Sequence, residues 1–112
     1  VPVCQCFEAL FLELHPRLFL HLHNLDINPL QVAFPWLHFG FVSVLDVDQL
    51  LLLWDRLFGF MDPYLLAVLA VGIFIFKTNP LMHATTKVDA LRLLSDFDGI
   101  NVVAIIQLVL FR

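Results

Sequence analysis

The chain has 112 residues and a formal charge of −4, and 61% of its residues are apolar. That apolar share exceeds the roughly 45–50% of ordinary soluble domains, and a chain this short hides only about 60–65% of its unfolded surface. A protein partner or a membrane must therefore cover the surplus. The six basic residues are scattered singly, which argues against nucleic-acid binding and against a polybasic lipid anchor.

Seven helices are predicted from apolar spacing and helix-end signals, so the fold class is all-α. The predicted helices cover residues 6–14, 17–24, 30–41, 46–58, 63–77, 87–97 and 100–111. Strand remains the competing interpretation only for Gly72–Phe76 and Val102–Ile106, where β-branched residues cluster. No repeat, hairpin turn or low-complexity linker divides the chain, so residues 1–112 are interpreted as one unit.

The predicted boundaries follow prolines and capping residues. Pro16 breaks the first helical stretch, and Asn28-Pro29 and Asp62-Pro63 each supply an N-cap followed by an N1 proline. Two capping boxes are predicted, in which Asp46 pairs with Gln49 and Thr86 pairs with Asp89. Asn79-Pro80 is expected to stop the long apolar helix.

The most apolar segment, Tyr64–Phe76, is the candidate membrane span. It is thirteen residues long, whereas a spanning helix needs about 20. Extension back to Leu57 reaches that length only by including Asp62 and Pro63, and a carboxylate within a span is costly. We therefore expect a helix buried inside a helical protein, not a membrane span.

Several short motifs occur in a fixed order and resemble the second half of a TBC domain, the helical module that activates GTP hydrolysis by Rab proteins. His15-Pro16-Arg17-Leu18-Phe19, with His21 and Leu22, resembles the D-P-E-L-F/Y-x-H-L segment of that family. The I-x-P-x-x-x-A-x-x-W stretch is matched by Ile27, Pro29, Ala33 and Trp36. Leu50, Leu53, Trp54 and Asp55 resemble the L-L-R-L-W-D signature, although Leu52 replaces its arginine and His15 replaces the acid of the first motif.

The resemblance implies that this chain is a partial TBC domain, its C-terminal subdomain, with Pro29, Trp36, Trp54 and Asp55 as structural signature residues. The family supplies an arginine finger from I-x-x-D-x-x-R and a glutamine finger from Y-x-Q-G, and such an arginine is worth about 10³–10⁵ in rate. Both motifs precede the matched part. The single tyrosine, Tyr64, is followed by Leu65-Leu66, so no catalytic residue is assigned.

The signature pair Trp54-Asp55 has two interpretations. Trp54 is expected to anchor the core from an apolar helix stripe, while Asp55 caps a neighbouring helix or pairs with a cation. The alternative is that Asp55 contacts the Rab directly, which makes it the one candidate binding residue.

Metal and cofactor chemistry is not expected. Cys4 and Cys6 are one residue apart instead of the two to four residues usual for zinc, and His21 and His23 point to different sides of a helix. Asp46, Asp48 and Asp55 fit helix capping and solvent-facing positions better than a calcium loop or acid–base pair. No nucleotide-binding or hydrolase motif supports an enzyme acting by itself.

The sequence therefore predicts the scaffold of a Rab-activating domain, with a Rab and the N-terminal half of the same domain as partners. A non-catalytic helical interaction module and a small membrane-anchored protein remain alternatives. Val1 stands where a complete chain has Met, and no signal peptide follows, so an internal piece of a longer cytoplasmic protein is expected. Through its Rab, the parent would be peripheral to endomembranes.

Overall fold

A computed structural model describes residues 2–38, 41, 45–60, 64–97 and 99–110, without the side chains of residues 2, 56–60 and 110. This part of the chain is entirely helical, which confirms the all-α prediction. The helices are α1 (Pro2–Leu14), α2 (Pro16–Asn24), α3 (Pro29–His38), α4 (Val47–Phe60), α5 (Leu65–Phe76), α6 (Thr78–His83), α7 (Lys87–Leu94) and α8 (Val102–Leu110). Gly72–Phe76 and Val102–Ile106 lie in α5 and α8, so the strand alternative is wrong.

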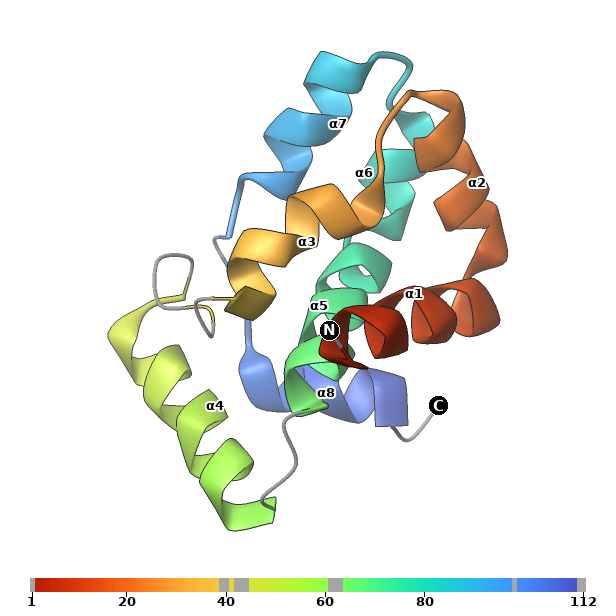
Figure 1. Ribbon diagram of the computed structural model, residues 1–112. Coiled ribbons are helices and arrows are strands. Elements are labelled where there is room, and N and C mark those ends of the chain that lie inside the picture. The colour runs from red at the N-terminus through yellow and green to blue at the C-terminus, as the bar shows by residue number, and fades with distance from the viewer. Residues whose placement is uncertain (1, 39–40, 42–44, 61–63, 98, 111–112) are drawn as a thin grey trace.

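Helix α5 forms the centre of the fold, with α1 and α3 on one side and α8 on another (Figure 1). Its buried residues face all directions, as expected for a helix that is apolar all round. Small residues let the neighbours approach closely. A Cβ at Gly72 would overlap Ile105 Cγ2 and lie 3.1 Å from Val109 Cγ2, so α8 packs directly on the α5 backbone at this glycine.

Aromatic rings join the helices around α5. Phe74 contacts Phe7 and Phe11 of α1 at centroid distances of 5.8 and 5.1 Å, and Phe11 contacts Phe19 of α2 at 5.4 Å. Trp36 of α3 lies on the other side of Phe74 at 5.7 Å. Offset and edge-to-face ring pairs add roughly 0.5–1.5 kcal/mol each beyond their buried area. This cluster therefore fixes how α1, α2 and α3 sit on α5.

Two predicted N-caps are confirmed. Asn28 Oδ1 accepts a hydrogen bond from Leu30 N at 3.0 Å, and Thr86 Oγ1 accepts one from Asp89 N at 3.2 Å. His15 also caps α2, since its Nδ1 accepts from Leu18 N at 3.2 Å. Thus an imidazole nitrogen caps α2 at the position where the resembling family has an acid. Asp62-Pro63, the remaining predicted start, lies outside the described residues.

One helix was not predicted. The apolar helix α5 ends at Phe76, close to the predicted end at about Lys77, but a new helix, α6, begins at Thr78 and includes Asn79 and Pro80. Pro80 falls in the first turn of α6, where backbone N–H groups have no intrahelical acceptor and proline is tolerated. The chain turns at Lys77 and immediately starts a new helix, so the described part has eight helices instead of about seven.

Helix α4 lies at the edge of the molecule, where α8 is the helix that it contacts most (Figure 1). Gln49 was predicted to pair with Asp46, but its Oε1 accepts a hydrogen bond from Val102 N at 2.8 Å. Val102 is the first residue of α8, and its N–H has no acceptor within that helix. The glutamine therefore ties α4 to the start of α8.

Within the described residues, no helix is both long enough and apolar enough to cross a membrane. The candidate span from Leu57 to Phe76 includes the end of α4 and all of α5, with residues 61–63 outside the description.

Candidate functional site

Pro29 and Trp36, the first two signature residues, have clear structural positions. Pro29 is buried at the first position of α3, directly after its Asn28 cap. Trp36 is also buried, and its ring contacts Phe41, Phe74 and Phe97 at 6.1, 5.7 and 5.4 Å. Both residues fix α3 against the core.

Trp54 and Asp55 lie on α4, about one and a half turns beyond Gln49. The prediction that Trp54 anchors the core is wrong, because its side chain is 36% exposed. Leu53 is the fully buried residue on this stretch of α4, and Trp54 follows it about 100° around the helix. Asp55 is exposed as well. The structure thus places the pair at the surface.

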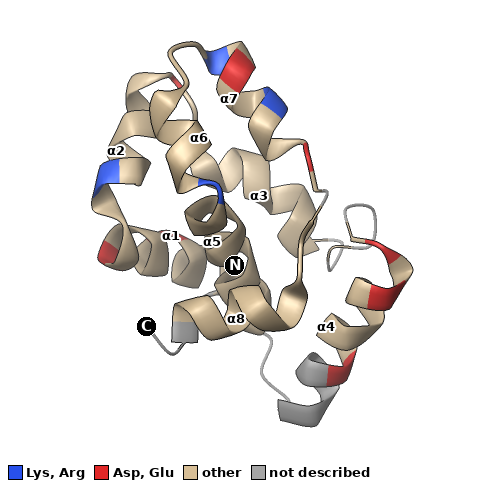
Figure 2. Cartoon of the chain, turned by 180° about the vertical axis from the view of Figure 1, so that it is seen from behind, with Lys and Arg blue, Asp and Glu red and all other residues tan. Residues whose placement is uncertain are grey.

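The exposed surface of α4 is mostly apolar. We define the α4 outer face as the exposed residues at its start and middle, which are Val47, Asp48, Leu51, Leu52, Trp54 and Asp55. Val47, Leu51 and Trp54 recur at helical spacing, and Asp48 and Asp55 flank them. Figure 2 shows the acidic residues of α4 on the edge of the molecule. Contiguous exposed apolar side chains of this kind are typical of surfaces where proteins contact each other.

Two polar side chains connect helices inside the fold. His21, which matches the histidine of the family motif, has its Nε2 3.1 Å from Ala84 O, so it donates across from α2 to the end of α6. Lys77 is buried at the end of α5 and donates from Nζ to Leu93 O at 2.7 Å and to Asp96 O. A cation at the carboxyl end of α7 also complements its helix dipole. Both residues are structural.

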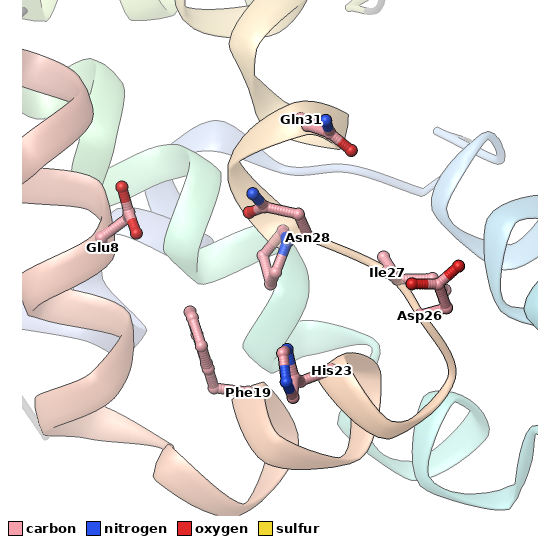
Figure 3. Close-up of a pocket in the computed structure, with 8 residues that line it drawn as sticks. Glu8, Phe19, His23, Asp26, Ile27, Asn28 and Gln31 are labelled. Atoms are coloured by element: carbon pink, nitrogen blue, oxygen red, sulfur yellow. The ribbon is translucent and has the colours of Figure 1, made fainter.

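A pocket of about 270 Å³ opens between α1, α2 and the start of α3. Its polar lining residues are Glu8, His23, Asp26, Asn28 and Gln31. Its apolar lining residues are Phe19, Ile27 and Pro29. Figure 3 shows Glu8 on α1 facing the Asn28 amide from the opposite side, with Phe19 and His23 below them. We call it the α1–α3 pocket.

The candidate metal ligands do not assemble. Among the residues that the structure describes, no three His, Cys, Asp or Glu side chains gather closely enough to hold an ion. Cys4 is buried and Cys6 is half-buried, and the two form no disulfide with each other. His21 and His83 are engaged with the backbone oxygens of Ala84 and Asn79.

No local sequence pattern indicated the α1–α3 pocket, because its residues come from α1, α2, the start of α3 and the turn before it, and no motif joins them. Lys77 carried a usable signal that was missed. A lone lysine at the end of a helix that is otherwise apolar must either reach solvent or find backbone oxygens, and here it finds two.

Comparison with known proteins gives one family match and one similar protein, and both agree with the all-helical fold and with the order of the motifs. The Rab-GTPase-TBC domain matches residues 3–82, which include α1 to α5 and most of α6. The chain therefore belongs to the TBC domain family. It is also 39% identical, over 111 residues, to human TBC1 domain family member 19. That alignment covers 99% of this chain and 21% of the relative, so the chain spans about a fifth of that protein's length. No solved structure matches.

Proposed function

We propose that this chain is the C-terminal part of a Rab GTPase-activating domain and acts there as scaffold, without fingers of its own. The motifs it carries are those that follow the two finger motifs in the family. The observation that carries the proposal is the α4 outer face, which leaves Leu51 57% and Val47 69% exposed. An apolar surface of this kind fits packing against the finger-bearing half of the domain.

The first test asks whether the chain alone accelerates GTP hydrolysis. The rate of hydrolysis by a panel of Rab proteins is measured with and without the purified 112-residue chain. The chain alone should leave each intrinsic rate unchanged, because no arginine finger stabilises the charge that develops on the transferred phosphoryl group. A clear acceleration by the chain alone would overturn the proposal. Circular dichroism of the same sample shows whether the chain is helical during the assay.

The role of the α4 outer face needs a longer form of the protein that includes the finger motifs. Leu51→Asp should weaken packing of the two halves and lower Rab-stimulating activity at least tenfold. Leu20→Asp is the matched control, since Leu20 is 58% exposed on α2, away from α4. Equal activity of both variants would show that the halves do not meet at α4.

Asp55 offers a second candidate role, direct contact with the Rab, which its exposure permits. In the longer form, Asp55→Asn should then weaken Rab binding while the unfolding midpoint stays the same. If Asp55 instead supports packing between the halves, the midpoint falls together with activity. Asp48→Asn, an exposed acid two turns earlier on the same side of α4, controls for the general loss of negative charge.

A further inference from the structure

The α1–α3 pocket contains a carboxylate without a counter-ion. Glu8 is half-buried, and among the described residues it has neither an ion pair nor a hydrogen bond. Asp26, the other acid of the lining, is 98% exposed and lies 3.7 Å from Lys87 Nζ, so water and this lysine already surround its charge. No described buried side-chain oxygen lacks a partner, so the Glu8 carboxylate keeps contact with water. Glu8 therefore places an unpaired negative charge at the pocket, where a cation can reach it.

The remaining lining fits a long cationic side chain. Phe19, Ile27 and Pro29 supply an apolar wall against which methylene groups can pack while the charged end reaches a polar group. Asn28 Oδ1 uses one lone pair for Leu30 N and keeps the second, and Gln31 adds another amide. No Lys or Arg lines this pocket, and Lys87, the cation of the adjoining hollow, lies on the Asp26 side.

Arginine suits this arrangement better than lysine. A guanidinium presents five N–H donors in a plane, which can meet the Glu8 carboxylate and an amide oxygen together and stack on the Phe19 ring. A lysine ammonium is a point charge that cannot stack in this way. We propose that the α1–α3 pocket binds an arginine side chain of a partner polypeptide.

A polypeptide is favoured over a free small molecule because a second hollow adjoins the pocket. This hollow, of about 220 Å³, shares Asp26, Ile27, Asn28 and Gln31 with it and continues to Leu91 of α7. A residue next to the arginine can therefore rest on the apolar surface of Val32 and Leu91. The site does not depend on the GTPase proposal, since it lies between α1 and α3 instead of on α4.

Nuclear magnetic resonance titration of the ¹⁵N-labelled protein with acetyl-Ala-Arg-Ala-amide tests the site. We expect saturable shifts of the Glu8, His23 and Gln31 amides, weaker shifts with the lysine peptide and none with the glutamine peptide. Equal shifts with arginine and glutamine peptides, or no saturation, would overturn the proposal. Equal affinity for the lysine peptide would overturn the choice of arginine.

Glu8→Gln should lower the affinity for the arginine peptide about tenfold, which is the loss expected when one hydrogen bond to a charged group is removed. Glu13→Gln is the matched control, because Glu13 is an exposed acid on the same helix that does not line the pocket. Equal affinity of the two variants contradicts the proposal. Shifts of the Glu8 amide that depend on protein concentration without peptide would instead indicate a second copy of the chain, and would also overturn it.

Discussion

Helices α4 and α5 are both rich in large apolar residues, yet their surroundings differ. In α5, eight residues from Leu65 to Phe74 are buried, whereas Val47, Leu51, Leu52 and Trp54 of α4 are exposed. The difference lies in size and position. Ala67, Ala70 and Gly72 let neighbours close in around α5, but α4 has neither Ala nor Gly from Val47 to Asp55 and meets α8 mainly along one side. Apolar composition alone therefore does not decide which helix is central.

The largest expected contrast comes from the same substitution in both helices. Leu69→Ala, at a fully buried site in α5, should lower the free energy of unfolding by about 2–5 kcal/mol. Leu51→Ala, at an exposed site in α4, should change it by about 0.5 kcal/mol or less. Urea unfolding followed by circular dichroism measures both. Similar losses would mean that α4 is as enclosed as α5.

The end of α5 is tested by Lys77→Met, which removes the amine but keeps most of the apolar stem. Leu93 O and Asp96 O would each lose a charged donor, so we expect a loss of about 2–3 kcal/mol in the free energy of unfolding. Lys87→Met is the control, since its ion pair with Asp26 is half-exposed and should cost well under about 1 kcal/mol. Equal midpoints in urea would contradict this role of Lys77.

Gly72→Ala tests the close approach of α8 to α5. Alanine favours helix by about 1 kcal/mol, but overpacking against Ile105 costs about 1–3 kcal/mol. Ile105 Cγ2 is a branched methyl close to the backbone and moves away only with the whole side chain. We therefore expect a net loss of up to about 2 kcal/mol in thermal or urea unfolding. A stabilised variant would show that α8 can shift outward.

The smallest effect tests what holds α4 in place. Gln49→Ala removes the acceptor of Val102 N and should cost about 1 kcal/mol or slightly more. Hydrogen exchange of the α4 amides should accelerate more than that of the α5 amides, because α4 has fewer other contacts. Gln107→Ala, an exposed glutamine on α8, is the matched control. Uniform acceleration in both helices would indicate that α4 does not open separately.

Local sequence signals predicted much of the fold. Proline and capping residues gave the starts of α3 and α7, because a cap is a contact between residues two or three positions apart. The sequence predictions failed where one local signal is compatible with two different structures. Pro80 can end one helix or sit in the first turn of the next, and Gln49 can bond to its own helix or to another.

The sequence by itself determined the family, the all-α class and most helix boundaries, since these depend on order, spacing and neighbours along the chain. Only the tertiary structure decided that Trp54 is exposed and that Glu8 lies in a pocket without a counter-ion. These properties depend on which helices pack together. Segments far apart in the chain set the surroundings of each side chain, and no local pattern encodes them.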